Sequence, residues 1–540
     1  MTARTRTDVL LIAGFCGFLF FYGMGQFGLI GADEPRYAQV AREMLERHDW
    51  ITPVLGGPAW LEKPPLYYWQ AMLAYSVLGV NDVAARIPGA IDATLLVVAV
   101  YLFFRKFRRG VEVDAALITA SCAGVIGYAH AASMDMALAA TFSMGMLAWW
   151  AWRESGTHAY LALFYACLAL GTLAKGPVAP FLAAAVILLF AVVARELGLV
   201  VRALWLPGLV LFCAIALPWY FAVQMRNPQF FREFILQHNL TRFSSDLYHH
   251  RQPFWYYLPV TAVALVPWTV FVIAAFAESV RIWWAERKSV SEDPDLELQF
   301  RMFVCCWLVV PVAFFSISQS KLPGYILPAI PAGAILLADY LRRHLAQQEE
   351  GVPKSLSVMH ALVAAAPIIP SVLIAYVITQ HRLPAGRPMF IALVVAFVLC
   401  AAIALTLASR LRLRMLRFVT LIPLVLSVAA VLKLGTVSMD QTLSARPLAV
   451  ELAAVETQQL PLAVYGVPRE MEYGLTFYRN QTTARYEAGG IPAEEHLLVA
   501  PATWKVNVAK QTAGRRVLFL GNYAPQNVDY YWVSAAVAKP

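Results

Sequence analysis

Long unbroken apolar runs dominate this sequence, and they restrict the chain to folds that a lipid bilayer can accommodate. Hydrophobic residues occupy 60% of the 540 positions and charged residues only 14%, whereas soluble domains carry about 25% charged residues. These figures exclude a disordered chain and argue against a water-soluble enzyme. A membrane β-barrel would show short alternating segments instead, so the sequence predicts an α-helical polytopic membrane protein.

The apolar runs predict about thirteen transmembrane helices, several of them slightly shorter than the ~20 residues that a bilayer requires. The expected spans are 8–28, 84–104, 113–131, 134–152, 158–174, 177–194, 204–223, 256–279, 302–317, 324–341, 360–379, 389–408 and 418–436. The run 66–79 is also apolar but short, and it is rich in aromatic residues. We interpret it as a helix that lies at the outer membrane face.

Clusters of Lys and Arg between the apolar runs predict the orientation of the chain. The densest clusters, within 105–109 and 410–417, fall on the same side as the smaller ones if the N-terminus is cytoplasmic. The net charge of +9 therefore reflects topology, and no nucleic acid partner is expected. All seven cysteines lie inside apolar runs, so we expect neither disulfides nor a cysteine-based metal site.

Two domains are predicted. Residues 1–436 form a membrane domain with two outer loops, 29–83 and 224–255, and residues 437–540 form a small α/β domain on the outer side. The last region contains four short β-like runs, at 462–465, 497–500, 517–520 and 530–533, separated by Gly, Pro and Asn. Its basic and acidic residues balance, which argues against a strongly anion-binding domain.

The first outer loop concentrates acid–base couples at the expected membrane surface. Asp33 and Glu34 directly follow the first span, and Arg36 comes two residues later. Glu62 and Lys63 form a second couple in front of two prolines. A carboxylate at such a surface is partly desolvated, which raises its basicity unless a cation is near. These residues fit either a catalytic site or a solvated loop.

Three further ionisable residues stand at the outer ends of predicted spans. Asp135 lies at the edge of an apolar run, so it is either a functional residue or a helix-start carboxylate that the helix dipole favours. Lys175 and Lys321 lie on the side that Lys and Arg otherwise avoid. They either anchor the chain to lipid headgroups or bind a ligand phosphate.

The middle outer loop is polar and then aromatic. His249 and His250, with Arg242 and Arg251, give it groups that can hold a metal ion or an anion, although adjacent histidines are more often not ligands. The aromatic run 254–257 fits an interfacial belt or a groove for a sugar or a lipid.

Nucleotide-binding motifs are not found in the sequence. It contains neither a P-loop nor a convincing glycine-rich dinucleotide fingerprint after a predicted strand. An enzyme without a nucleotide site, whose charged residues lie at the outer membrane face, needs a donor whose energy-rich bond already lies in the membrane. The sequence therefore suggests a lipid-borne donor.

Five segments give the chain a resemblance to the lipid-phosphate-dependent C-type glycosyltransferases. They read ADEPRYAQVAREM, EKPPLYYW, LAKG, RFSSDLYHHRQPFWYYLPV and SKLPGYILP. The resemblance covers most of the membrane core, weakens over 350–540, and is strongest to the bacterial aminoarabinose lipid A transferases. The acidic motif of the first loop is shared by the wider family, so it indicates the enzyme class and not the substrate.

The resemblance implies a C-type glycosyltransferase fold in a bacterial inner membrane, with the active site and the C-terminal domain in the periplasm. It implies transfer of 4-amino-4-deoxy-L-arabinose from undecaprenyl phosphate to a phosphate of lipid A, which confers resistance to polymyxin and similar cationic peptides. Asp33, with Glu34 beside it, corresponds to the catalytic carboxylate of the first loop. Asp135 corresponds to a second acidic position, although its context SMDM differs from the LDP-like pattern of the family.

The resemblance also implies a set of residues around the donor phosphate and lipid, which are Arg36, Lys63, Lys175, Lys321, Tyr325, Arg242 and Arg251. No cofactor is expected to be required. A divalent metal ion on Glu62, His249 and His250 is left open.

Three other functions compete with this one. A related transferase of the same architecture, such as a protein mannosyltransferase or another lipid A sugar transferase, fits the same motifs. A lipid or solute transporter would place ionisable residues near the bilayer midplane and would show inverted repeats, and neither feature is visible. A non-catalytic membrane scaffold for the C-terminal domain is the remaining alternative.

Overall fold

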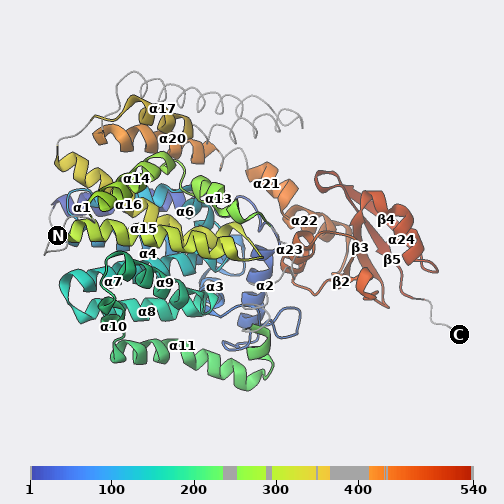
Figure 1. Ribbon diagram of the computed structural model, residues 1–540. Coiled ribbons are helices and arrows are strands. Elements are labelled where there is room, and N and C mark those ends of the chain that lie inside the picture. The colour runs from blue at the N-terminus through green and yellow to red at the C-terminus, as the bar shows by residue number, and fades with distance from the viewer. Residues whose placement is uncertain are drawn as a thin grey trace. The chain divides into compact units, whose positions relative to one another are not determined.

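The computed structural model describes residues 3–234, 252–286, 295–347, 351–364, 413–430, 432 and 436–536. The chain divides into two compact units (Figure 1). The helical unit contains Met1–Tyr22, Leu61–Gln70 and Arg86–Val431, and the sheet-containing unit contains Gly23–Trp60, Ala71–Ala85 and Leu432–Pro540.

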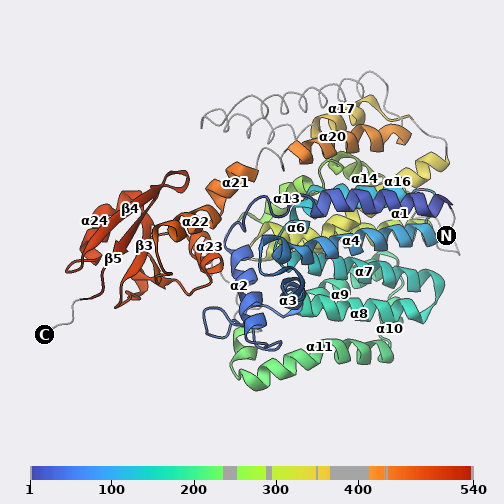
Figure 2. The same cartoon turned by 180° about the vertical axis from the view of Figure 1, so that it is seen from behind.

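Helices make up the first unit. They are α1 (Ala3–Cys16), α4 (Asp82–Phe107, whose first turn belongs to the other unit), α5 (Glu112–Ser121), α6 (Ala123–Ala129), α7 (Asp135–Ser155), α8 (His158–Lys175), α9 (Val178–Val193), α10 (Gly198–Ala203), α11 (Leu206–Arg226), α13 (Tyr257–Ala264), α14 (Thr269–Glu286), α15 (Leu296–Ile317), α16 (Ile330–Ala346), α17 (Lys354–Ala364) and α20 (Leu416–Ala430). Figures 1 and 2 show α7, α8, α9 and α15 lying lengthwise beside one another.

Aromatic side chains fill the space between several of these helices. The rings of Trp149 and Trp150 on α7 each lie 5.1 Å from the ring of Phe303 on α15. Phe190 on α9 packs edge-on against the same two tryptophans. Because lipid tails are as apolar as these side chains, close packing rather than a hydrophobic driving force holds such helices together.

Within the described residues, five helices are long and apolar enough to cross a membrane, or up to seven if each bent pair is one span. They include α4, α8, α11 and α15. The predicted fold class, a membrane protein of many helices, is therefore confirmed. The number of spans stays a prediction, because the expected spans 360–379 and 389–408 lie largely outside the described residues.

Two expected spans are broken rather than straight. Residues 113–131 fold as α5 and α6, which meet at 65°, and residues 256–279 fold as α13 and α14, which meet at 114°. The breaks support each other, because Ala123 N donates to Val266 O at 2.8 Å. Backbone groups freed from a helix inside a membrane need such protein partners, since lipid offers none.

The sheet-containing unit is an α/β domain with additional helices. Its strands are β1 (Leu462–Val464), β2 (Ala484–Arg485), β3 (His496–Pro501), β4 (Val517–Tyr523) and β5 (Val528–Val533), in the order β2-β1-β3-β5-β4. β1 pairs in parallel with β2 and β3, while β5 pairs antiparallel with β3 and β4. Its helices are α2 (Asp33–Glu46), α21 (Thr436–Leu443), α22 (Arg446–Val455), α23 (Arg469–Arg479) and α24 (Lys505–Gln511).

The two faces of the sheet are covered by different helices (Figure 1). Leu448 and Leu475, on α22 and α23, pack with Leu497 and Val499 of β3. On the other face, Val508 of α24 belongs to a smaller core cluster. The four β-like runs expected from the sequence all form strands, and the two-residue strand β2 was not expected.

The boundary of this unit differs from the predicted one at residue 437. Part of the first outer loop, Gly23–Trp60, belongs to the same compact unit as the sheet. The reason is a set of contacts between segments far apart in the sequence, such as the 2.7 Å hydrogen bond from Gly28 N to Asp440 Oδ1. The apolar run 66–79 forms helix α3 (Leu66–Leu78) as expected, and its place at the membrane face stays a prediction.

Candidate functional site

Asp33 and Glu34 occupy the first turn of α2, where the helix dipole favours carboxylates. Their surroundings differ. Glu34 is buried, and its Oε2 accepts a hydrogen bond of 2.8 Å from Ile30 N. The side chain of Asp33 is 49% exposed. Of the two predicted carboxylates, Asp33 is therefore the one that a ligand can reach, while Glu34 holds the backbone that enters α2.

Arg36 lies one helical turn after Asp33 and forms an ion pair with its Oδ1. The Arg36 side chain is only 13% exposed. Its guanidinium carbon lies 5.0 Å from the ring centre of Tyr37, 5.1 Å from that of Trp60 and 5.6 Å from that of Tyr473. Aromatic faces attract a cation and fix its direction, so this guanidinium is held by rings as well as by Asp33.

A second carboxylate–cation pair lies in the helical unit. Asp135 is the first residue of α7 and Lys175 is the last residue of α8, and the two form an ion pair. The contact joins a helix N-terminus that favours an acid to a helix C-terminus that favours a base. The Lys175 ammonium also lies 4.4 Å from the ring centre of Tyr325. The structure thus brings three of the predicted site residues together.

Gly324 allows this cluster to form. A Cβ atom at this position would lie 2.6 Å from Tyr128 Oη and 2.9 Å from the carboxyl carbon of Asp135. Real Cβ atoms essentially never make contacts that short. The segment that carries Tyr325 can therefore approach Asp135 only because residue 324 has no side chain.

Lys321 is buried, with 7% of the residue exposed, and its ammonium donates to the carbonyl oxygen of Ser318. Burial lowers the pKa of Lys321, because desolvation disfavours its charged form. The adjacent Leu322 exchanges two hydrogen bonds with the Tyr257 hydroxyl, at 3.0 and 3.1 Å. An ammonium has three donors, so Lys321 can serve a ligand as well as Ser318.

Only one of the three predicted metal ligands, Glu62, lies among the described residues. Glu62 and Lys63 are half-buried residues of the helical unit. His249 and His250, like Arg242 and Arg251, lie outside the described residues. Within the described ranges, no group of three or more His, Cys, Asp or Glu side chains could hold a metal ion. The metal site stays a prediction.

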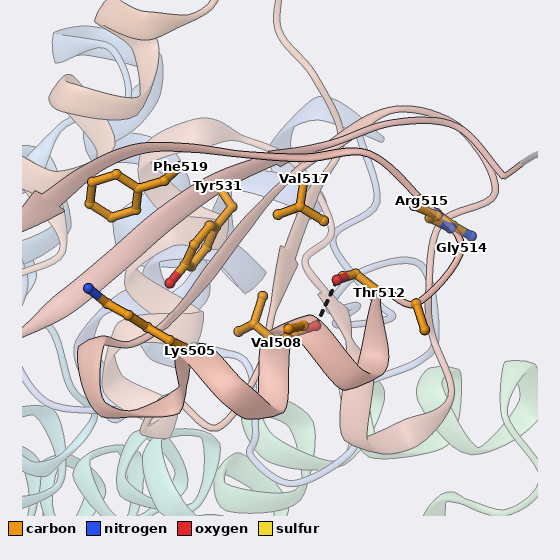
Figure 3. A pocket seen from close by; sticks show the side chains of 10 residues that line it. Lys505, Val508, Thr512, Gly514, Arg515, Val517, Phe519 and Tyr531 are labelled. Atoms are coloured by element: carbon orange, nitrogen blue, oxygen red, sulfur yellow. Dashed lines mark hydrogen bonds between the residues drawn. The ribbon is translucent and has the colours of Figure 1, made fainter.

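Two hollows in the described residues differ in chemistry. An apolar groove of about 600 Å³ lies on α13, α14 and α15, and its lining includes Trp255, Leu258 and Phe276. A hollow of about 430 Å³ in the sheet-containing unit is lined by Lys505, Phe519 and other residues shown in Figure 3. The Lys505 ammonium lies 3.7 Å from Asp529 Oδ2, so its charge is already balanced.

Known proteins resemble the chain over most of its length. Residues 12–232 match the family model described as dolichyl-phosphate-mannose-protein mannosyltransferase. An undecaprenyl phosphate-α-4-amino-4-deoxy-L-arabinose arabinosyl transferase of Pseudomonas savastanoi is 33% identical over 401 residues, which are 73% of this chain and 72% of the relative. The chain belongs to this family of arabinosyl transferases. It is therefore a glycosyltransferase, and the predicted enzyme class is confirmed.

A second relative agrees with this assignment, and a solved structure is similar in fold. The Pseudomonas aeruginosa PAO1 transferase is 32% identical over 354 residues, which are 64% of this chain and 61% of that relative. The crystal structure of ArnT from Cupriavidus metallidurans bound to undecaprenyl phosphate has a TM-score of 0.71 and 23% identity. The match covers 98% of this chain and 99% of that one, so the two share a fold.

Several residues of this arabinosyl transferase family member were not identified from the sequence alone. Trp60 and Tyr473 flank Arg36, and Gly324 and Tyr128 flank Asp135. Gly324 stands inside the quoted segment SKLPGYILP, so its position was visible although its role was not. Nothing in the sequence links Tyr473 to Arg36, because they lie in distant parts of the chain.

Proposed function

We propose that the chain transfers 4-amino-4-deoxy-L-arabinose from undecaprenyl phosphate to a phosphate group of lipid A, at the periplasmic face of a bacterial inner membrane. The observation that carries this proposal is 33% identity over 401 residues to a relative named for this donor. Two carboxylate–cation pairs supply chemistry suited to a phosphate-bearing donor. The absence of a nucleotide motif in the sequence agrees with a lipid-borne donor.

The reaction proceeds by inverting displacement at the anomeric carbon of the sugar. An oxygen of the acceptor phosphate attacks this carbon, and the bond to the donor phosphate oxygen breaks. Undecaprenyl phosphate leaves with the electron pair, through a transition state that resembles an oxocarbenium ion. Negative charge grows on the departing phosphate, and cations aimed at such charge are usually the largest source of catalysis.

Following the family resemblance, we assign this stabilisation to Arg36, Lys63, Lys175 and Lys321. Arg36 and Lys175 are each oriented by a carboxylate and by aromatic rings. A cation fixed in this way needs little reorganisation when charge develops on the phosphate. Tyr325 contributes through Lys175, whose ammonium lies over its ring.

Asp33 is not required as a strong base in this scheme. A phosphate monoester has a second pKa of about 6, so most of the acceptor is already dianionic at neutral pH. Asp33 instead orients Arg36 and offers its exposed carboxylate to the amine of the donor sugar. Asp135 plays the corresponding orienting role for Lys175.

The apolar groove on α13, α14 and α15 suits a prenyl chain, because its lining is aliphatic and aromatic along most of its length. Its lining includes Phe254 and Trp255, which closely precede Tyr257, and the Tyr257 hydroxyl bonds the backbone next to Lys321. We therefore assign the groove to the lipid part of the donor.

Mass spectrometry of lipid A tests the proposal. Cells that express the chain should add an aminoarabinose-sized mass to lipid A, and cells that express the Asp33→Asn variant at the same level should not. The added cationic sugar offsets phosphate charge and weakens the attraction of polymyxin, so resistance should follow the mass change. Unmodified lipid A in both strains would refute the proposed acceptor.

A related transferase is the second candidate, because residues 12–232 match a protein mannosyltransferase model. The two strains described above, which express the chain and its Asp33→Asn variant, also distinguish the two functions. Sugar on periplasmic proteins, lost in the Asp33→Asn strain and accompanied by unchanged lipid A, would favour the second candidate.

A further inference from the structure

Arg36 is enclosed by aromatic rings from two distant parts of the chain. Tyr37 and Trp60 come from the first outer loop, whereas Tyr473 comes from α23, which packs on the central sheet of the C-terminal region. All of these residues belong to the sheet-containing unit. The domain that follows the membrane helices therefore reaches a residue that the proposed mechanism uses.

Helix α23 is itself firmly held. Met471 and Leu475 on its inner side are buried in the core against β1 and β3. In addition, Arg485 of β2 bonds Glu472, the neighbour of Tyr473, with a nitrogen–oxygen distance of 2.6 Å. Tyr473 thus projects from a helix that the sheet fixes in place.

Further contacts join α23 to the first loop. Arg42 of α2 donates to Phe477 O on α23 at 3.2 Å. The Tyr478 hydroxyl accepts from Leu29 N and donates to Asp82 Oδ1, both at 2.6 Å. The bond from Leu29 N to Tyr478 fixes the backbone just before α2, and the bond from Arg42 to Phe477 fixes the side of α2. The C-terminal region therefore positions both the start and the side of this helix.

We infer that Tyr473 is a positioning residue for Arg36, and that the C-terminal α/β region thereby forms part of the catalytic apparatus. A ring beneath a guanidinium limits the directions in which its N–H groups point. Arg36 then meets the donor phosphate with its donors already aligned, which matters most in the transition state. The inference rests on the role proposed for Arg36.

The experiment measures kcat and KM of the full-length chain in detergent, with the undecaprenyl-phosphate-linked aminoarabinose donor and lipid A as the acceptor. Tyr473→Leu removes the ring and keeps an apolar side chain on α23. We expect a loss of about tenfold in kcat, with KM changed by less than about twofold, because an oriented cation acts mainly in the transition state. Tyr473→Phe keeps the ring and should retain turnover.

Two controls separate positioning from a general effect on the domain. Phe519→Leu removes an exposed ring on β4 of the same unit and should leave kcat unchanged. In an Arg36→Gln background, Tyr473→Leu should cause no further loss, because its effect passes through the guanidinium. Thermal unfolding and size-exclusion profiles establish that each variant is folded, and Tyr473→Met is a second ring-free variant.

Each outcome decides the matter. Full activity of folded Tyr473→Leu, an equal loss in Phe519→Leu, or an additive loss in the Arg36→Gln background would overturn the inference. Failure of both ring-free variants to fold would assign Tyr473 a structural role instead. Normal turnover of Arg36→Gln would refute the role of Arg36 in the proposed function, whereas impaired Arg36→Gln with unaffected Tyr473→Leu would refute only this inference.

Discussion

Gly324→Ala tests whether close approach of the 323–325 segment to Asp135 is necessary for the reaction. The added methyl group would meet Tyr128 Oη at 2.6 Å, Tyr128 Cζ at 2.8 Å and the carboxyl carbon of Asp135 at 2.9 Å. Two of these contacts involve one tyrosine ring, and the third involves a carboxylate already paired with Lys175. Tyr128 and Asp135 must therefore shift, because a simple side-chain rotation would not make room for the methyl group.

Overpacking of this kind commonly costs about 1–3 kcal/mol. A shift of the Asp135 carboxylate would disturb its ion pair with Lys175, and losing one donor aimed at developing charge commonly costs about 10²–10³-fold in rate. We expect Gly324→Ala to unfold at a lower temperature in detergent and to transfer sugar about 10²-fold more slowly.

Gly127→Ala is a matched control. Gly127 lies on α6 next to Tyr128, and a Cβ atom there would meet nothing within 4 Å. Alanine at an open helical position stabilises by about 0.5–1 kcal/mol relative to glycine, so this variant should be at least as stable as the parent chain and equally active. A Gly324→Ala variant that matches Gly127→Ala in both measurements would refute the reasoning.

Substitutions at three positions of the predicted site are further tests, in transfer assays of the purified chain. Asp33→Asn should lose more than about 10²-fold in rate while its unfolding temperature is unchanged; near-normal turnover would remove Asp33 from the mechanism. Glu34→Gln keeps an acceptor for Ile30 N and should stay active, whereas Glu34→Ala should lose about 1 kcal/mol of stability; an inactive, stable Glu34→Gln would make Glu34 catalytic. Burial lowers the pKa of Lys321, so its charge is lost at a lower pH than that of a free lysine. Lys321→Arg keeps its charge, and the alkaline limb of its pH–rate profile should move to higher pH; an unmoved limb would exclude Lys321 as the titrating group.

The membrane helices were predictable because a span needs a continuous apolar run, and such runs are visible in the sequence. The bends within 113–131 and 256–279 were not, because hydropathy is continuous across them. Their stability comes from tertiary contacts between the two breaks, such as the bond from Trp268 Nε1 to Ser121 Oγ at 2.8 Å. Pro267 was the only local sign of the second break.

The candidate site was predictable to different extents. Asp33 and Arg36 lie three positions apart, a spacing that brings side chains together on a helix. Asp135 and Lys175 were both expected at outer helix ends, and the antiparallel packing of α7 and α8 turned that expectation into a contact. Tyr473 could not be foreseen, because its contact with Arg36 depends on the tertiary fold of the sheet-containing unit.

The two clusters of the candidate site share one arrangement: a carboxylate pairs with a cation, and the cation also lies over an aromatic ring. Asp33 and Trp60 hold Arg36 in this way, and Asp135 and Tyr325 hold Lys175. A cation that is free to turn would follow the phosphate of the donor, of the transition state and of the released lipid, with little difference between them. Such uniform binding slows product release without lowering the barrier. A paired carboxylate offsets part of the attraction to a ground-state phosphate, while the ring keeps the cation aligned for the charge that appears as the bond breaks. Because the leaving phosphate carries more negative charge than the phosphodiester of the donor, a cation fixed in this direction favours the transition state over the bound donor.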